Sequence, residues 1–299
     1  MKIDTWLKEN THSLRGKTIV VSGSTGGLGR PLCAYLADLG ADLILLDRNS
    51  ALSSDHRKQL LVRRPDISVE CVPIQLDDPA SVRSAAETLK KYPVDIFISN
   101  AGAYSIPRKT CTSGYDNVFQ INFVSPYILI SELLPTLRKR HGRVVAVGSI
   151  AHRYSRPDPS DIDFSTRHKS SLVYGNSKRY LMLVLAEMFR NEPDVGFSIT
   201  HPGITFTNIT AHYPKLIFAI IKRPMKIIFP KPDLACLSIL RGVFEDTQGE
   251  EWIGPRFFDI WGTPKKKKLR ATDPRELEYF RKWNGICAER KEDAEKSLS

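Results

Sequence analysis

The chain has 299 residues, of which 41% are hydrophobic and 26% charged, and its formal net charge is +11 at pH 7. These proportions are ordinary for a globular protein with a buried core, and they exclude compositional disorder except in the charged tail after Cys287. Residues 1–16 are charged throughout and lack the apolar run of a signal peptide, and no stretch approaches the ~20 consecutive apolar residues that span a bilayer. We therefore expect a soluble, cytoplasmic protein that at most lies on a membrane surface.

The cysteines and the basic residues exclude two further classes of site. The five cysteines stand singly, without a CxxC pair or a histidine at ligand spacing, which is typical of reduced thiols and predicts no metal site. An excess of positive charge can indicate a nucleic acid or an anionic membrane as partner. The one dense basic run is 265–268, and a solvated face accounts for it. No recognition pattern accompanies this run, so we expect no nucleic acid partner.

Short apolar runs alternate with helical patterns along most of the chain. In chain order the pattern predicts a strand at 17–22, a helix at 31–39, a strand at 42–47, a polar helix ending near 62, a strand at 67–74, a helix at 79–90, a strand at 94–99, helices at 115–123 and 125–138, a strand at 143–148, a helix at 172–190, a strand at 195–200, a helix at 233–244 and a strand at 252–260. Apolar strands that alternate with helices imply a doubly wound parallel sheet with helices on both faces. We predict one α/β domain.

Domain boundaries follow from the places where this alternation stops. We predict an N-terminal extension at 1–16, a catalytic domain at 17–264, and a basic, charged C-terminal extension at 265–299. Within the domain, 207–232 mixes apolar and basic residues and is predicted to be a substrate lid. Its apolar residues either line the pocket or rest on a membrane as a peripheral contact.

A glycine-rich turn follows the first predicted strand and precedes a helix. Glycines let the backbone turn sharply and let a pyrophosphate approach the free N–H groups at the helix N-terminus. This placement predicts a dinucleotide site. Its predicted cofactor contacts are Gly23, Ser24, Thr25, Gly27, Leu28 and Gly29.

The end of the second predicted strand bears on the choice of cofactor. Asp47 stands there, and a carboxylate at this position accepts hydrogen bonds from the adenosine ribose and repels a 2′-phosphate. Arg48 follows at once and could instead pair with a 2′-phosphate if Asp47 turned away. The sequence favours NAD and leaves NADP open.

Tyr174 and Lys178 open the long predicted helix four residues apart, so their side chains share one face. A free tyrosine has a pKa near ~10, and a neighbouring cation together with a positive nicotinamide ring would lower it toward neutral pH. The pair is a candidate for proton transfer.

Several motifs follow one another in order along the chain. They are the glycine turn, Ser99-Asn100-Ala101-Gly102, Asn122 within 120–123, Gly148-Ser149, Tyr174 with Lys178, and His201-Pro202-Gly203. From about Gly16 to Pro264 this set resembles the short-chain dehydrogenase/reductase family, and the turn resembles its TGxxxGxG pattern with Ser22 in place of threonine. The resemblance implies one Rossmann-like domain and an NAD(P)-dependent oxidoreductase that acts on alcohol or carbonyl groups.

The same resemblance implies a role for each matching residue. Tyr174 would be the general acid/base, Ser149 would hydrogen-bond the same substrate oxygen, and Lys178 would bind the nicotinamide ribose. Asn122 would hold a water that relays protons to solvent. Further cofactor contacts would come from Asn100, Ala101, Gly102, Pro202, Gly203 and Thr207. His201 is expected to be a packed residue at a strand end.

The chain departs from the family pattern at the adenine side of the cleft. Gln75, before Leu76, stands where the family has aspartate, and its amide can also donate and accept hydrogen bonds. The long connection between Ser149 and Tyr174, with Asp161-Ile162-Asp163-Phe164, resembles the retinol-dehydrogenase-like branch. This likeness suggests a small-molecule alcohol or carbonyl substrate that is bulky and lipophilic.

Two rival functions and one assembly question stay open. A non-catalytic dinucleotide-binding scaffold would keep the cleft, but it would not need the proton-transfer group of Tyr174. A nucleic acid binder would use Lys265 to Lys268 and bind with strong salt dependence. The family resemblance implies a homo-oligomer, although the C-terminal extension could block one interface.

Overall fold

The computed structural model describes residues 3–204, 230–247, 251–269, 273–276 and 278–280. At its centre is an eight-stranded sheet with the strand order β3-β2-β1-β4-β5-β6-β7-β8. Its strands are β1 (Thr18–Ser22), β2 (Asp42–Asp47), β3 (Val69–Pro73), β4 (Val94–Ser99), β5 (Arg143–Val147), β6 (Gly196–Thr200), β7 (Glu251–Phe257) and β8 (Trp261–Lys268). β1 to β7 pair in parallel and β8 returns antiparallel to β7. The predicted doubly wound α/β fold is confirmed.

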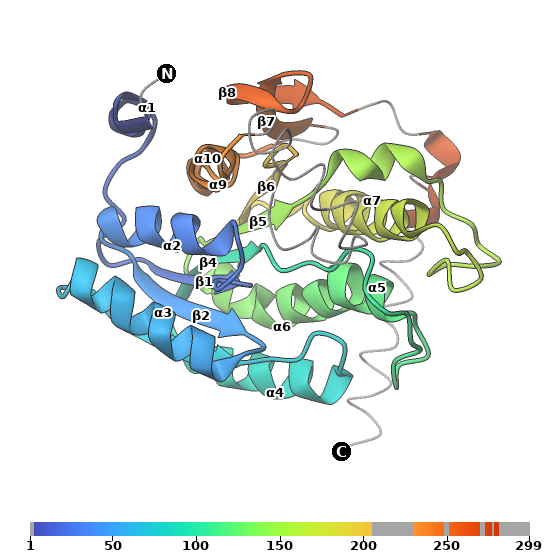
Figure 1. The fold of residues 1–299 in the computed structure, drawn as a ribbon, viewed down its shortest axis with the longest axis horizontal. Coiled ribbons are helices and arrows are strands. Elements are labelled where there is room, and N and C mark those ends of the chain that lie inside the picture. The colour runs from blue at the N-terminus through green and yellow to red at the C-terminus, as the bar shows by residue number, and fades with distance from the viewer. Residues whose placement is uncertain (1–2, 205–229, 248–250, 270–272, 277, 281–299) are drawn as a thin grey trace, which may run out of the picture.

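Helices cover both faces of this sheet (Figure 1). They are α1 (Ile3–Asn10), α2 (Gly29–Asp38), α3 (Ser50–Arg63), α4 (Pro79–Leu89), α5 (Asn117–Phe119), the π-helical turn η1 (Gln120–Val124), α6 (Ser125–Lys139), the 3-10 turn η2 (Ile150–Tyr154), α7 (Ser170–Met188), α9 (Pro232–Ala235) and α10 (Leu237–Phe244). Apolar side chains of α4, α6 and α7 form one buried cluster with the sheet. A second cluster joins α1, α2, α3 and α10 to the opposite face.

Local chemistry explains where several of these helices begin. The side chain of Asn49 accepts a hydrogen bond from the Leu52 N–H at 3.0 Å, which caps α3. Asp78 caps α4 in the same way through the Ala80 N–H, and Pro79 occupies the first helical position, as the sequence predicted.

Two predicted helices form a single continuous run in the structure. α5, η1 and α6 follow one another from Asn117 to Lys139 without a break. This run is long and apolar enough to cross a membrane by length and composition, but 72% of its apolar window is buried in the protein. It lies in the core beside α4 and α7, which accounts for its hydrophobicity without a bilayer.

Both predicted extensions contribute to the folded domain. In α1, Trp6 is buried and packs into the core cluster of α2 and α10. The predicted boundary at 264/265 falls inside β8, where the basic run forms the edge strand of the sheet. The sequence pattern missed both elements because α1 is polar on most sides and β8 is rich in lysine, which has a low strand propensity.

The parallel strands give the sheet two distinct edges. We call the carboxyl edge the side on which β1, β4, β5 and β6 end, at Ser22, Ser99, Val147 and Thr200. We call the amino edge the opposite side, where the same strands begin. In open α/β sheets ligands bind outside the carboxyl ends of the strands, so the carboxyl edge is where a site is expected.

Candidate active site

The glycine turn lies at the carboxyl edge between β1 and α2. Gly23 has φ +68°, a conformation that favours glycine, and a Cβ there would lie 3.0 Å from the Cα of Ala101. A Cβ on Gly29 would meet the carbonyl oxygen of Gly23 at 2.2 Å. Since α2 begins at Gly29, directly after Leu28, the turn presents the helix N-terminus at this edge, as a dinucleotide site requires.

Asp47, at the end of β2, is buried and holds the glycine turn. Its Oδ1 accepts hydrogen bonds from the N–H and the hydroxyl of Thr25, at 3.1 and 2.9 Å. Its Oδ2 accepts bonds from the hydroxyls of Ser24 and Ser53. Both carboxylate oxygens are therefore engaged by the protein, whereas the neighbouring Arg48 is exposed.

Asn100, after β4, fixes the same turn from the other side. Its amide donates to the carbonyl oxygens of Ser22 and Gly23 at 2.9 and 3.1 Å. The backbone N–H groups of Asn100 and Ala101 both donate to the Ser22 hydroxyl. The serine that replaces the family threonine thus anchors the turn to the end of β4.

Asn122 lies in the π-helical turn η1 and is fully buried. Its Oδ1 accepts from the Ala103 N–H at 2.8 Å, and its amide donates to the Ala103 carbonyl and to the Ser177 hydroxyl. A Cβ on Gly102 would lie 3.1 Å from the Asn122 oxygen and 3.5 Å from Lys178 Nζ. Asn122 therefore joins the loop after β4 to α7, in the place that the sequence indicated. π-Helical turns frequently occur at functional sites.

Tyr174 and Ser149 meet at the carboxyl edge. Ser149 follows β5 and caps η2, and its side chain hydrogen-bonds the Tyr174 phenol. Burial raises the pKa of Tyr174 to about 12, although the bond to Ser149 lowers it and nearby Tyr104 raises it further. From the sequence, a neighbouring cation and a positive nicotinamide ring are expected to lower this pKa. The described protein atoms alone raise it, so the phenol is protonated at neutral pH.

Lys178 is buried one helical turn beyond Tyr174. Its ammonium donates to the carbonyl oxygen of Val147 at 2.8 Å and lies 6.0 Å from the centre of the Tyr174 ring. Burial lowers the pKa of Lys178 to about 8, so the group remains mostly protonated at pH 7. The structure therefore brings together Tyr174, Ser149 and Lys178, three of the four side chains that were assigned to the chemistry. The fourth, Asn122, is hydrogen-bonded to the same helix.

The remaining predicted residues divide between described and undescribed parts of the chain. Gln75 is exposed and Leu76 partly buried beyond the end of β3, at the carboxyl edge of the sheet. Pro202 is buried after β6, and Gly203 has φ +85° with β7 and its turn packed against it. Thr207 and most of the predicted lid at 207–232 lie outside the described residues, which resume at 230.

Three side chains at this edge escaped the sequence analysis. Tyr104 packs edge-on against Tyr174 with ring centres 5.2 Å apart, and Ser177 bonds Asn122. Asp259, in the turn after β7, pairs with Arg153 at 3.2 Å, and its carbonyl lies 3.2 Å from His201 Nε2. Only Tyr104 carried a local signal, as an aromatic residue two positions after the Ser99-Asn100-Ala101-Gly102 motif. His201 stacks on Trp252 with ring centres 4.9 Å apart, as expected of a packed strand end.

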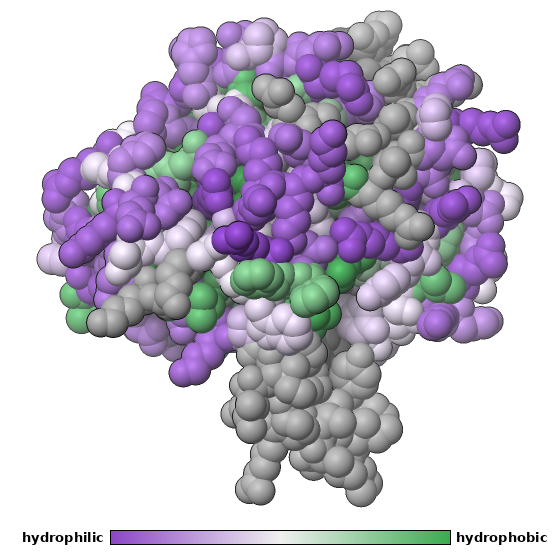
Figure 2. All heavy atoms as spheres, turned by 90° about the horizontal axis from the view of Figure 1, so that it is seen from above, coloured by the Kyte–Doolittle hydropathy of each residue, from purple (hydrophilic) through white to green (hydrophobic). Residues whose placement is uncertain are grey.

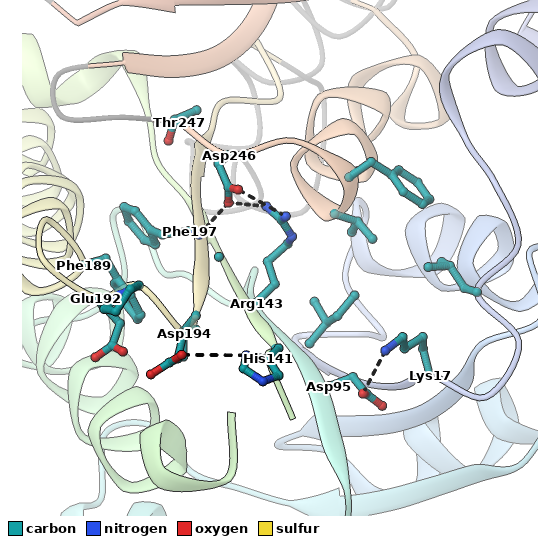
Figure 3. A pocket seen from close by; sticks show the side chains of 18 of the residues that line it. Lys17, Asp95, His141, Arg143, Phe189, Glu192, Asp194, Phe197, Asp246 and Thr247 are labelled. Atoms are coloured by element: carbon teal, nitrogen blue, oxygen red, sulfur yellow. Dashed lines mark hydrogen bonds and ion pairs between the residues drawn. The ribbon is translucent and has the colours of Figure 1, made fainter. Parts of the chain in front are cut away.

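A cavity of about 750 Å³ opens on the opposite, amino edge (Figure 3). Charged side chains line it in pairs, with Lys17 on Asp95, Arg143 on Asp246, and His141 facing Asp194. None of the predicted catalytic or cofactor residues contributes to its lining. We therefore place the candidate active site at the carboxyl edge, on the chemistry of the residues rather than on the volume of the cavity.

Comparison with known proteins agrees with this geometry. The model of the short chain dehydrogenase family matches residues 17–161, which include the glycine turn, Asn100, Asn122 and Ser149. Over these residues the chain matches the short-chain dehydrogenase/reductase family, and this match together with the relatives below supports an NAD(P)-dependent oxidoreductase. Among the described residues, no group of three or more His, Cys, Asp or Glu side chains could hold a metal ion.

The chain's relatives include retinol dehydrogenases, as the likeness of the long connection to that branch suggested. It is 28% identical to retinol dehydrogenase 14 of Mus musculus over 275 residues, which cover 82% of each chain. It is 24% identical to polyprenol dehydrogenase of Homo sapiens, over 91% of this chain and 84% of that one.

Solved structures show the same fold. A crystal structure of an uncharacterised protein from Mycobacterium paratuberculosis superposes with a TM-score of 0.71 at 24% identity, covering 94% of this chain and 92% of that one. The Pseudomonas aeruginosa RhlG/NADP active-site complex superposes with a TM-score of 0.59 at 23% identity, covering 78% and 93%.

Proposed function

We propose that the protein transfers a hydride between a nicotinamide cofactor and a bulky, lipophilic alcohol or carbonyl compound, with Tyr174 as the general acid/base. The observation that carries this proposal is the meeting of Tyr174, Ser149 and Lys178 beside the glycine turn, at the edge of the sheet where such ligands bind. A scaffold that only binds dinucleotides would have no use for a buried ammonium beside a phenol.

Each side chain has a distinct chemical task in this proposal. Tyr174 donates its phenolic proton to the carbonyl oxygen during reduction, and in oxidation the phenolate accepts the hydroxyl proton. Ser149 hydrogen-bonds the same oxygen and holds it against the phenol. Lys178, positive at neutral pH, favours the phenolate once the proton has left. When bound, the nicotinamide supplies or accepts the hydride.

The residues fit the cofactor at three places. The N-terminus of α2 and the glycine turn would hold the pyrophosphate, Gln75 lies on the adenine side, and Lys178 lies where it can bind the nicotinamide ribose. Asn100 and Asn122 keep the loops around this cleft in place, because their amides bond the backbone on both sides.

The contacts of Asp47 bear on the choice between NADP and NAD. Its two oxygens already accept four hydrogen bonds from the glycine turn and from Ser53, so a ribose would have to displace some of them. Arg48 is exposed next to it and can pair with a 2′-phosphate. We therefore infer that NADP binds at least as well as NAD, in place of the NAD preference drawn from Asp47.

The substrate class is supported by the surroundings of Tyr174 and by the relatives. Tyr104 packs against the phenol, and Val173, the residue before Tyr174 in α7, belongs to an apolar cluster with Val118 and Phe164. The relatives named above are a retinol and a polyprenol dehydrogenase, and both of these alcohols are long and lipophilic. An apolar wall suits such a substrate.

The proposal is tested by binding and turnover of purified protein. NADPH and NADH are titrated into the wild type, Arg48→Ala and Tyr174→Phe, and oxidation of retinol and of a polyprenol is then measured. Arg48→Ala should weaken NADPH binding by about tenfold and leave NADH unchanged, since one charge-assisted pair is lost. Tyr174→Phe should bind cofactor normally and lose about 10²–10⁴-fold in kcat.

Two outcomes would contradict parts of this proposal. Normal turnover by Tyr174→Phe would remove Tyr174 as the acid/base, and cofactor binding without turnover of either alcohol would favour the scaffold. An exposed histidine at the amino edge provides the control, because His141→Ala lies far from the motif residues and should change neither binding nor kcat.

A further inference from the structure

The β7–β8 hairpin carries an unusual surface at the carboxyl edge. β7 runs parallel to β6, so its end at Phe257 lies at the same edge as the candidate active site. The chain then turns and returns as β8, with Phe257 opposite Trp261 and Gly254 opposite Lys265. The turn of the hairpin therefore lies at the carboxyl edge, near the candidate active site, and β8 is the outermost strand of the sheet.

Large apolar side chains stand out from the tip of this hairpin. Phe258 is 82% exposed, Phe257 55% and Trp261 39%. Tyr154, also 55% exposed, lies at the end of η2, next to the Arg153 that pairs with the hairpin residue Asp259. Most of the strongly exposed large apolar side chains in the described residues thus belong to this one region, and such clustering marks an interaction surface.

Basic side chains follow the aromatic tip along both strands of the hairpin, and Lys268 is the farthest from the tip because it pairs with Glu251 at the start of β7. Lys265, Lys266 and Lys268 are exposed on β8, and Arg256 is exposed at the end of β7. Figure 2, which views the molecule from the side of this hairpin, shows small apolar areas set within a broad hydrophilic surface. The tip and the strand together combine aromatic anchors with positive charge.

The turn that presents the aromatic residues is held by its own buried contacts. Asp259 is 7% exposed and accepts from Lys267 at 2.6 Å, in addition to its pair with Arg153. Phe258 and Asp259 both have positive φ, of 53° and 58°, which is costly for residues other than glycine. A turn held in this conformation keeps Phe257 and Phe258 directed outward rather than folded onto the protein.

Ordinary structural roles account for only part of this surface. Lysines on an edge strand discourage pairing with another strand, which explains β8. They do not explain two adjacent exposed phenylalanines at the tip. A nucleic acid could use both aromatic stacking and lysines, but the lysines lie behind the tip rather than interleaved with it. This order, with aromatic residues at the tip and lysines behind them, suits a partner whose interior is apolar and whose surface is anionic.

We propose that the β7–β8 hairpin docks on an anionic lipid bilayer, with Phe257, Phe258 and Trp261 entering the interface and Lys265 and Lys266, the lysines of β8 nearest the tip, facing the headgroups. Aromatic side chains settle at the membrane interface, and each basic residue near an anionic surface adds attraction. Docking here brings the carboxyl edge to the membrane. The inference does not depend on the proposed reaction, since binding is measured without substrate.

The test is flotation of the full chain with vesicles in the absence of cofactor and substrate. Vesicles of phosphatidylcholine alone are compared with vesicles that contain roughly one-third phosphatidylserine. The wild type should bind the anionic vesicles at least about tenfold more tightly, and high salt should weaken this binding.

Two hairpin variants separate the aromatic from the basic contribution. Phe257→Ser with Phe258→Ser should lose about tenfold or more in affinity for anionic vesicles. The matched control is Leu52→Ser with Val62→Ser, two exposed apolar side chains of α3, which should bind like the wild type. Lys265→Glu with Lys266→Glu should abolish the anionic preference, whereas Lys58→Glu on α3 should not. NADPH binding and circular dichroism establish that each variant is folded.

Several results would overturn the proposal. The wild type could fail to float, the hairpin variants could float as well as the wild type, or the α3 controls could lose as much affinity. Hairpin variants that lose binding to a single-stranded RNA oligonucleotide but not to vesicles would reassign the surface to nucleic acid. If they instead convert a dimer to a monomer in size-exclusion chromatography, the surface is an interface between two copies.

Discussion

The two edges of the central sheet differ in how their charged side chains are paired. At the amino edge, partly exposed cations face carboxylates, as in the pairs Lys17–Asp95 and Arg143–Asp246, at 3.3 and 2.6 Å. At the carboxyl edge, Lys178 is 2% exposed, and its described hydrogen bond is to a carbonyl oxygen rather than to a carboxylate. The first arrangement stabilises the fold, and the second costs free energy because the charge is desolvated.

This difference in the pairing of charged side chains locates the candidate active site better than the volume of the cavity does. The amino edge has the large cavity, yet its charges serve each other. The carboxyl edge holds a buried ammonium and a partly buried phenol whose pKa values are displaced in opposite directions, to about 8 and about 12. Displaced pKa values of this kind cluster at functional sites.

Replacing Lys178 gives the largest expected effect on this comparison. Lys178→Met should reduce kcat by about 10²–10⁴-fold. It should also raise the free energy of unfolding at pH 7 by about 1–3 kcal/mol, because a buried charge is replaced by an apolar chain of similar length. Steady-state kinetics and urea denaturation measure the two effects. The matched control at the amino edge is Lys17→Met, which should keep its activity and lose stability, since it removes a cation from the buried Asp95.

The pH dependence of this gain in stability has a definite sign. The folded pKa of Lys178 is about 8, below the ordinary value of 10.5, so the folded protein releases this proton first as pH rises. The cost of the buried charge is present in full below pH 8 and disappears toward pH 10.5. The stability advantage of Lys178→Met should therefore shrink between pH 8 and pH 10, and an advantage that grows over this range would contradict the assignment.

We expect a fall in pH to destabilise the carboxyl edge of the sheet before the amino edge. Burial lowers the pKa of His201 to about 4, against the attraction of Asp259, while the unfolded chain titrates at 6.5. The unfolded state therefore binds the extra proton first, and stability is lost as pH falls from 6.5 through 4. His201→Gln should reduce this loss by about 1–3 kcal/mol, as measured by denaturation at pH 7, 5.5 and 4.5.

An exposed histidine at the amino edge provides the comparison. The side chain of His141 is 80% exposed, so His141→Gln should follow the acid curve of the wild type. Buried His152, whose pKa burial also lowers to about 4, keeps part of the acid sensitivity in His201→Gln. Equal effects of the His141 and His201 variants would show that burial does not control the acid response.

Much of the fold was predictable because its strands are buried on both faces. β2 and β4 were predicted with the same bounds as observed, since each is a short apolar run that gives way to polar residues, Arg48 and Asn100. The glycine turn and the Tyr174–Lys178 spacing could be recognised because their pattern is local in the sequence, and the structure brings these residues together at the carboxyl edge. α1 and β8 were missed, since Trp6 and the lysines of β8 take their places through contacts with distant residues.

The sequence could not predict how the site residues are engaged. Asp47 is recognisable as the end of a strand, but its bonds to Ser24, Thr25 and Ser53 depend on three-dimensional packing. The pKa of Tyr174 similarly depends on burial and on Tyr104, 70 positions earlier in the chain. The identity and spacing of the residues indicated the candidate site. Their burial and contacts in the folded protein determine their hydrogen bonds and pKa values.

Breaking an ion pair of the cavity should give the smallest effect. Asp246→Asn removes the charge that faces Arg143, while the new amide oxygen can still accept from the Phe197 N–H. Because the Asp246 side chain is half exposed, we expect a loss of about 0.5–1 kcal/mol in the free energy of unfolding, with kcat and cofactor affinity unchanged. Asp38→Asn, which breaks the surface pair with Arg63, is the control for a pair outside the cavity. A change in kcat beyond about twofold in Asp246→Asn alone would mean that the cavity is coupled to the carboxyl edge through β5 and β6, and the two edges would no longer be separable.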